Sequence, residues 1–296
     1  MKPAPFEYQA PASLEAALDV LARHGGEAKI LAGGQSLIPV MNFRLAEPAL
    51  LIDINKLTEL DFIRRDEDGS LRIGGLTRQR RLERDPLVAE AAPLLHEAVP
   101  FIAHPQIRNR GTFGGSLAHA DPAAELPALA VALRARLRLR RDGGERWVDA
   151  GDFFGGLFTT ALEPDEILVE AAIPPLAPRT GWAFLEVARR HGDYAQVGIA
   201  ALLTLDEAGR CREARLVYLS AGDRPIEARE AARLLVGEEI SPPAITAAAE
   251  KASREELSPF GDVHASAEFK RHLARVLTGR ALRRAAERAR NGRAAA

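Results

Sequence analysis

The chain has 296 residues, of which 47% are hydrophobic and 27% are charged, and this ordinary globular composition is enough for two domains. Its formal net charge of −1 provides no electrostatic footprint for nucleic acid or for an anionic membrane, so we expect neither as a partner. The single cysteine, Cys211, excludes an internal disulfide and a cysteine-ligated metal cluster within this chain.

The amino-terminal residues lack the apolar core of a signal peptide, and no run approaches the length that spans a bilayer. We therefore expect a cytoplasmic protein without a transmembrane segment. Ser13 is a predicted helix N-cap, and Gly25 ends the helical pattern that follows it. A small strand-helix-strand lobe is predicted, with strands around 6–8, 28–31 and 50–54 and a helix over 14–24.

The second of these strands runs into a glycine turn. Gly33 and Gly34 lack a Cβ, so they permit positive φ and let a ligand approach the backbone closely. Successive amide N–H groups in such a turn can bind a phosphate, and the Ser36 hydroxyl could add another donor. The segment 29–37 is therefore a candidate anion site.

A second lobe of strands and helices is predicted to follow. Its expected elements are strands over 61–64 and 71–74, helices over 78–84 and 86–99, hairpin strands over 133–140 and 146–148, and a strand over 167–169. The hairpin prediction depends on Asp142-Gly143 between its two alternating strands. Residues 73–77 contain a third glycine step, for which an ordinary turn is at least as good an interpretation.

A second glycine segment, 111–117, repeats the Gly-Gly pair followed closely by Ser-Leu. Two such segments far apart in the sequence suit a ligand with two phosphates, which backbone N–H groups of both would bind between two lobes. Behind it, Asp121 and Pro122 predict the start of a helix, and a helix N-terminus would strengthen an anion site.

The proline-rich residues 174–178 are the best candidate for a linker to a separate α+β domain. That domain is predicted to contain a three-stranded antiparallel sheet over 181–187, 197–205 and 214–220, then helices over 227–235, 242–256 and 265–288, and a tail over 291–296. Arginines cluster near its end, where a solvated helix face is the expected interpretation and a docking surface the weaker alternative.

The two glycine segments, with residues 121–127 behind the second, resemble the FAD-binding (medium) subunit of molybdenum hydroxylases, the family of carbon monoxide and xanthine dehydrogenases. The resemblance implies an α+β fold: a two-lobed vanillyl-alcohol-oxidase (PCMH)-type FAD-binding domain followed by an α+β C-terminal domain. The implied domains are residues 1–176, with lobes of about 1–57 and 58–176, and residues 177–290. Gln35 stands where some flavoproteins of the wider fold carry a histidine that attaches to FAD, so we expect FAD to be bound non-covalently.

The resemblance and the glycine segments together assign residues to FAD binding. They are Lys29, Leu31, Ala32, Gly33, Gly34, Gln35, Ser36, Leu37, Ile102, Ala103, Gly111, Thr112, Gly114, Gly115, Ser116, Ala118, Asp121, Glu125, Leu168, Asp193 and Tyr194. Among them, Tyr194 is implied to stack on the flavin and Leu168 to pack against it. Many relatives carry a lysine near the flavin where this chain has Leu185 and Glu186. No catalytic residue and no metal ligand is predicted, and His104 and His119 are interpreted as structural.

The resemblance also implies separate partner chains: a large molybdenum-cofactor subunit and a small [2Fe-2S] subunit, in a dimer of heterotrimers. The FAD would take electrons from the [2Fe-2S] subunit and pass them to an external acceptor such as NAD, a quinone or oxygen. One alternative is a self-sufficient FAD-dependent reductase or oxidase of the same fold, for which Ser116 and Glu125 are the only close candidates as proton donor. A flavin-free scaffold protein is a further alternative.

Overall fold

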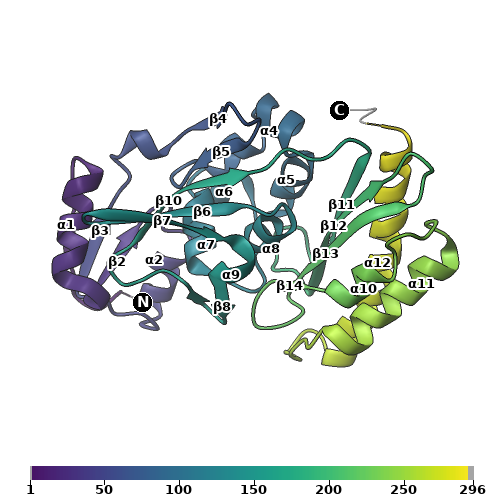
Figure 1. Cartoon of the computed structure of the whole chain (residues 1–296). Helices are drawn as coiled ribbons and strands as arrows, with labels where there is room; N and C mark the ends of the chain where they lie inside the picture. The colour runs from purple at the N-terminus through teal and green to yellow at the C-terminus, as the bar shows by residue number, and fades with distance from the viewer. Residues whose placement is uncertain (1, 293–296) are drawn as a thin grey trace.

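A computed structural model describes residues 2–292 and arranges three main sheets along the molecule (Figure 1). The expected tail over 291–296 falls mostly on residues 293–296, which lie outside the described residues. No helix within residues 2–292 is long and apolar enough to cross a membrane.

The first sheet is parallel and has the order β1-β3-β2, with β1 at Glu7–Gln9, β2 at Ala28–Leu31 and β3 at Leu50–Asp53. Helix α1 (Leu14–His24) packs against it, and the Ser13 hydroxyl accepts a hydrogen bond from the Ala16 N–H at 3.2 Å, which confirms the predicted cap. Because β2 and β3 are parallel, both strands end at the same edge. A short helix that was not predicted, α2 (Leu37–Asn42), follows the glycine turn at this edge.

The second sheet is antiparallel and has the order β4-β5-β10-β6-β7. Its strands are β4 (Ile63–Arg65), β5 (Leu71–Gly74), β6 (Arg136–Arg141), β7 (Gly144–Asp149) and β10 (Ile167–Ile173). The β6–β7 hairpin is confirmed. Strand β10 lies in the centre of the sheet, and all of its residues are buried because other elements cover both of its faces.

Short helices surround this sheet. They are α3 (Gln79–Leu82), α4 (Pro86–Ala91), α5 (Pro93–Ala98), α6 (Pro105–Arg108), α7 (Phe113–His119), α8 (Glu125–Ala132) and α9 (Ala150–Phe153), and a two-stranded hairpin of β8 (Phe154–Gly156) and β9 (Thr159–Thr160) follows α9. The prediction of one helix over 86–99 was wrong. Pro93 has no N–H to donate, so the chain breaks at Ala92 and Pro93 begins the next helix.

The third sheet has four strands rather than the expected three, in the order β11-β12-β13-β14. They are β11 (Thr180–Val187), β12 (Val197–Leu205), β13 (Cys211–Leu219) and β14 (Ile226–Glu227). The two residues of β14 are too few to produce an alternating pattern, and they occupy the start of the helix predicted over 227–235.

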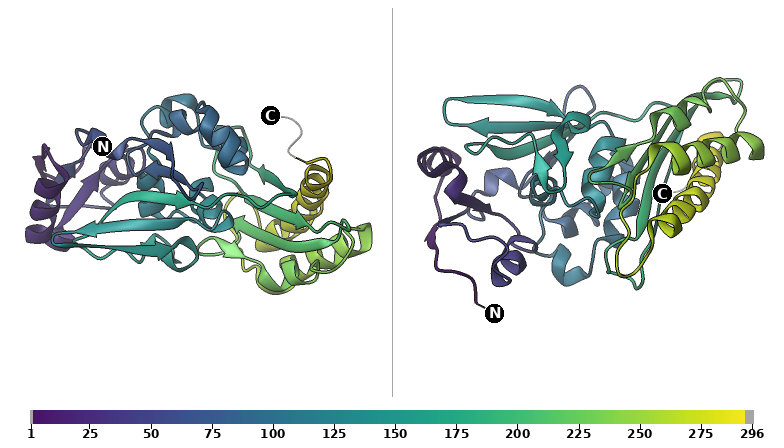
Figure 2. Two further views of the ribbon diagram at one scale, coloured as in Figure 1. Left: turned by 45° about the horizontal axis from the view of Figure 1, so that its top comes forward. Right: turned by 90° about the horizontal axis from the view of Figure 1, so that it is seen from below.

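Helices cover both faces of the third sheet (Figures 1 and 2). Helix α12 (Ala267–Arg290) packs on the outer face with α10 (Arg229–Arg233) and α11 (Pro242–Lys251), which continues as a π-helical turn over Ala252–Glu256. Helix α8 packs on the opposite face, between the second and third sheets.

The third sheet is attached to the rest of the molecule by apolar and ionic contacts. The rings of Phe101 and Phe184 lie 5.3 Å apart between their centroids. From α12, the Arg288 guanidinium donates to a carboxylate oxygen of Glu97 at 2.5 Å and to the Trp182 carbonyl at 2.8 Å. Arg284 also contacts Glu97, at 3.8 Å, so two members of the arginine cluster near the end of the chain join the two halves of the structure.

Candidate cofactor site

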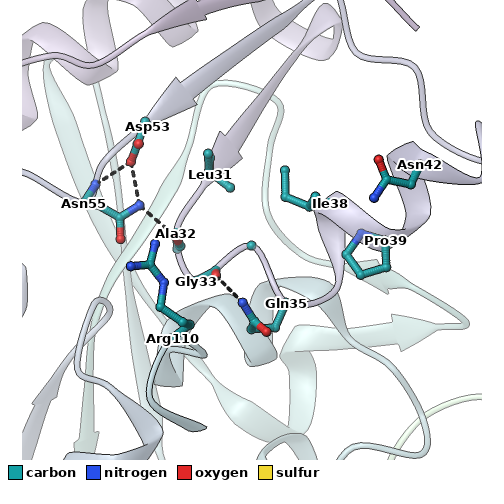
Figure 3. A pocket seen from close by; sticks show the side chains of 11 residues that line it. Leu31, Ala32, Gly33, Gln35, Ile38, Pro39, Asn42, Asp53, Asn55 and Arg110 are labelled. Carbon is teal, nitrogen blue, oxygen red and sulfur yellow. Dashed lines mark hydrogen bonds between the residues drawn. The ribbon is translucent and has the colours of Figure 1, made fainter. Parts of the chain in front are cut away.

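A pocket of 360 Å³ lies at the edge where β2 and β3 end (Figure 3). Crevices at the carboxyl ends of parallel strands commonly hold ligands. The lining residues come from the first glycine segment, from α2, from the residues after β3 and from the segment before α7: Leu31, Ala32, Gly33, Gly34, Gln35, Ile38, Pro39, Asn42, Asp53, Asn55 and Arg110. The first glycine segment is therefore part of a pocket rather than an ordinary surface turn.

The backbone of this segment offers open hydrogen-bond donors. Within residues 2–292, the N–H groups of residues 33–36 donate to no protein acceptor. Gly34 has φ +71°, a conformation that glycine adopts without strain. Gln35 folds back, so that its side-chain Nε2 donates to the Gly33 carbonyl at 3.1 Å, and the Ser36 hydroxyl makes no capping hydrogen bond to α2. Open amides and a free hydroxyl are the donors that an anion requires.

The two glycine segments, for which the sequence predicts a shared ligand, lie in contact with each other. A Cβ placed on Gly33 would lie 2.5 Å from the Arg110 carbonyl oxygen and 2.8 Å from the Gly111 Cα. A Cβ on Gly115 would lie 3.6 Å from the Ala32 Cβ. Segments separated by more than 70 residues are therefore in direct backbone contact, which only glycine at position 33 permits.

The second segment differs from the first, because its amides are already used. It forms the first turn of α7, where the N–H groups of Phe113 and Gly114 donate to the carbonyls of Thr77 and Gly75, both at 2.9 Å. The Gly115 N–H donates to the Thr112 hydroxyl, the N-cap of α7, at 3.0 Å. The expected open amide cradle is thus found in the first segment, while these donors of the second segment hold α7 in place.

The third glycine step explains why glycine stands at position 114. A Cβ on Gly114 would come within 2.7 Å of the Gly75 carbonyl oxygen, and a Cβ on Gly75 within 2.5 Å of the Leu168 carbonyl oxygen. Three backbone segments therefore stack without side chains between them. Residues 73–77 have a packing role that an ordinary turn would not require.

The predicted helix start at Asp121 was wrong. The Asp121 carboxylate accepts a hydrogen bond from the Ala123 N–H at 2.9 Å and so caps a turn, while α8 begins at Glu125. The Pro122 carbonyl accepts a hydrogen bond from the Ser220 N–H at 2.8 Å. This contact with the third sheet holds residues 121–124 out of helical geometry.

Polar residues that were not predicted bind the end of β3 to the first glycine segment. The Asn55 side-chain amide donates to the Ala32 carbonyl at 2.8 Å and to the Asp53 carboxylate at 2.6 Å (Figure 3). The Tyr8 hydroxyl donates to the other Asp53 oxygen at 2.6 Å. The signal in the sequence was the position of two polar residues, Asp53 at the end of a buried strand and Asn55 just after it.

Two arginines bring positive charge to the same edge. Arg110 lines the pocket, and the Arg78 guanidinium donates to the side-chain oxygen Oδ1 of Asn55 at 2.6 Å and to the Arg110 backbone carbonyl. Burial would raise the pKa of Asp53, but hydrogen bonds from Tyr8 and Asn55 and the charge of Arg110 outweigh burial and lower it. The pocket therefore holds a carboxylate that is charged at neutral pH beside cations able to bind phosphate.

Several predicted residues lie outside this pocket. Glu125 is only 8% exposed, and burial raises the pKa of its carboxyl to about 7. The side chain of Tyr194 is 68% exposed, so its ring is open to a ligand. The Asp193 carboxylate contacts the Arg190 and Arg189 Nε atoms at 3.3 and 3.5 Å, so neighbouring arginines already neutralise it.

The apolar candidates and the histidines differ in burial: Leu168 and Ile102 are buried, His119 is half-buried and His104 is exposed. Leu168 is 6% and Ile102 8% exposed, and Ala103 has φ +42°. The His104 side chain makes no capping hydrogen bond to α6; its ring instead lies so close to Gly192 that a Cβ there would be 2.3 Å away. The His119 ring lies 5.1 Å from that of Phe158, a packing contact as expected.

Comparison with known proteins agrees with this geometry. A family model described as FAD binding domain in molybdopterin dehydrogenase matches residues 4–176, and one described as CO dehydrogenase flavoprotein C-terminal domain matches residues 182–285. The class of protein is therefore an FAD-binding oxidoreductase flavoprotein, and the predicted combination of an FAD-binding domain with a C-terminal α+β domain is confirmed.

The chain belongs to the family of FAD-binding medium subunits of molybdenum hydroxylases. It is 44% identical to the 6-hydroxypseudooxynicotine dehydrogenase complex subunit alpha of Paenarthrobacter nicotinovorans, over 98% of this chain and 97% of the relative. Carbon monoxide dehydrogenase from Hydrogenophaga pseudoflava, solved without the Mo-pyranopterin moiety of its molybdenum cofactor, superposes with a TM-score of 0.94 at 38% identity, over 97% and 99% of the two chains. Quinoline 2-oxidoreductase from Pseudomonas putida 86 superposes with a TM-score of 0.92 at 41% identity, over 98% of this chain and 99% of that chain.

Proposed function

We propose that this chain is the electron-transfer subunit of a molybdenum-containing hydroxylase or dehydrogenase complex. In this proposal a [2Fe-2S] subunit supplies the electrons, and an external acceptor receives them. The observation that carries the proposal is the pocket at the ends of β2 and β3, where open amides and two arginines suit the pyrophosphate of FAD. When bound, FAD supplies the electron chemistry, and the protein contributes binding and orientation.

The first glycine segment would hold the phosphates, since residues 33–35 line the same pocket as Arg110 and their N–H groups donate to no acceptor within residues 2–292. The charged Asp53 carboxylate would accept a hydrogen bond from a ligand hydroxyl there. Farther from this pocket, the exposed ring of Tyr194 offers a stacking surface, while Leu168 and Ile102 are buried and keep their proposed role as apolar contacts of the flavin. The other assigned residues, including Glu125, keep their proposed role as cofactor contacts.

Further parts of the proposal come from the family. The FAD is bound non-covalently, because Gln35 has no nucleophilic nitrogen comparable with histidine. The molybdenum cofactor and the [2Fe-2S] clusters belong to a large and a small partner subunit, in a dimer of heterotrimers located in the cytoplasm. The proposed domain boundary at residues 176–177 is supported by the family matches, which end at 176 and resume at 182.

A self-sufficient flavoenzyme of the same fold is the second candidate. One observation favours it: burial raises the pKa of Glu125 to about 7, which suits a proton donor at neutral pH. Such an enzyme would turn over a small-molecule electron donor as a lone chain. The electron-transfer subunit would not turn over without its partners.

The test is an absorbance spectrum of the purified chain, followed by identification of what acid or heat releases. Flavin bands and free FAD in the supernatant are the expected result. Covalently retained flavin would contradict the non-covalent attachment. A colourless chain that refuses added FAD, both alone and when co-expressed with its partners, would overturn the assignment of the pocket.

A further inference from the structure

A second pocket, of 660 Å³, lies beside the first and is lined mainly by basic side chains. The lining residues are Arg78, Arg80, Arg81, Arg84, Asp85, Pro86 and Asn109, so four arginines stand against one carboxylate. Arg78 separates the two pockets, because its guanidinium bonds to Asn55 and to the Arg110 carbonyl on the side of the first pocket. Of the residues that line this second pocket, only Arg78 is also part of the proposed FAD site.

The arginines of this pocket differ in how far protein groups satisfy them. Arg80 contacts Glu83 at 2.7 Å, and Arg81 contacts Asp61 at 2.9 Å. Arg78 has no ion pair within residues 2–292, and the Arg84 side chain makes neither an ion pair nor a hydrogen bond there. Two guanidinium groups on one pocket therefore lack a carboxylate partner.

Positive charge exceeds negative charge around the pocket. Glu83 is shared, since the buried Arg108 also donates to it at 2.9 Å. The arginines at 78, 80, 81, 84 and 108 face the carboxylates at 61, 83 and 85. Burial and the neighbouring charge of Arg110 lower the pKa of Arg78. A bound anion would therefore stabilise the charged form of this side chain.

We propose that this basic pocket is a second anion site, which binds the phosphate groups of a nucleotide-sized ligand in addition to FAD. Planar guanidinium groups bind phosphate through paired hydrogen bonds and also stack on aromatic rings, so one set of arginines suits both parts of a nucleotide. The volume suits a ligand larger than a phosphate ion. A nucleotide here would lie next to the proposed FAD phosphates, separated from them by the hydrogen bonds of Arg78.

The experiment is a calorimetric titration of the FAD-loaded chain with ADP, and separately with inorganic phosphate. We expect saturable binding of ADP at one site, weaker binding of inorganic phosphate, and loss of affinity as salt rises. Arg84→Glu should weaken ADP binding by about tenfold or more. Arg84→Lys should weaken it by less, because lysine keeps the positive charge but loses the paired hydrogen bonds of the planar guanidinium. The flavin content of both variants should equal that of the parent chain.

Arg280→Glu on α12 is the matched control, because Arg280 is exposed and its side chain has no hydrogen bond or ion pair within residues 2–292. It changes the net charge equally and should leave ADP affinity within about twofold. Equal weakening by both charge reversals, release of FAD by ADP, or no saturable binding of ADP would each overturn the proposal. Flavin content is measured on the same samples, so failure of this site is distinguishable from failure of the FAD assignment.

Discussion

Gly33 and Arg110 touch so closely that a Cβ on Gly33 would lie 2.5 Å from the Arg110 carbonyl oxygen. This contact joins the open amides of the first glycine segment to the turn that leads into α7. It also keeps the Arg110 side chain at the edge of the pocket (Figure 3). The shape of the proposed phosphate site therefore depends on the absence of a single carbon atom.

Replacing Gly33 by alanine should remove most of the bound FAD. The new Cβ would meet backbone atoms that cannot rotate away, so the two glycine segments must separate and the amide cradle must distort. The measurement is the ratio of flavin to protein absorbance after purification. Gly26→Ala is the control, because a Cβ there meets nothing within 4 Å and its FAD content should be unchanged. Equal FAD content in both variants would contradict the assignment of the first segment.

Gly114→Ala should lower the free energy of unfolding of the protein. Its Cβ would lie 2.7 Å from the Gly75 carbonyl oxygen, inside the stack of backbone segments that positions α7. We expect a loss of about 2 kcal/mol in the free energy of unfolding, measured by chemical denaturation. Gly151→Ala, where nothing lies within 4 Å, should change it by less than about 0.5 kcal/mol. An unchanged unfolding free energy in Gly114→Ala would show that α7 can shift freely.

Glu186 gives a prediction about pH. One of its carboxylate oxygens is buried without a hydrogen-bond partner, and burial, with the charge of Glu125, raises its pKa from 4.5 to about 8. The unfolded chain releases this proton above pH 4.5, whereas the folded chain holds it until about pH 8, so the group costs stability as pH rises through that range. Glu186→Gln should therefore stabilise the fold at pH 8 by about 4 kcal/mol and have almost no effect at pH 4.

Chemical denaturation at both pH values measures this difference. The control is Glu207→Gln, an exposed glutamate whose side chain has no hydrogen bond or ion pair within residues 2–292. It should show no such dependence on pH. A stabilisation by Glu186→Gln that is equal at pH 4 and pH 8 would mean that Glu186 is ionised in the folded protein.

Tyr194→Ala should alter the flavin without harming the fold. The side chain is 68% exposed and buries little apolar surface, so the free energy of unfolding should change by less than about 0.5 kcal/mol. If the ring stacks on the flavin, its removal should increase the fluorescence of the bound flavin, while Tyr194→Phe should retain the quenching. Phe260→Ala, at a similarly exposed aromatic, is the control. Identical fluorescence in Tyr194→Ala and the parent chain would exclude stacking by this residue.

That the two glycine segments serve one site could be predicted from local chemistry, because glycine lets a backbone be approached closely. Their direct backbone contact at Gly33 and Gly111 is a finding of the fold. The use of the second segment's amides could not be predicted in this way. It depends on the carbonyls of Gly75 and Thr77, which reach α7 only through the tertiary fold.

Physical reasons also explain why the roles of Asp53 and Asn55 and the start of α8 were not predicted from the sequence. Asp53 and Asn55 were available from the sequence, but their role required the knowledge that β2 and β3 are parallel and end at one edge. Asp121 has good capping chemistry, yet the bond from Ser220 to Pro122 delays the helix by several residues. Local preference was overridden at this position by a contact almost 100 residues away.

The ion pair between Arg288 and Glu97 has a consequence for synthesis of the protein. The two residues are 191 positions apart, so Glu97 leaves the ribosome long before its partner is translated. Until then, the surface of α5 that receives β11 and α12 is exposed, with an unneutralised carboxylate among apolar groups such as Phe101. The nascent chain therefore carries an uncovered face for most of its translation, and a chaperone that recognises apolar surface would have its best opportunity there.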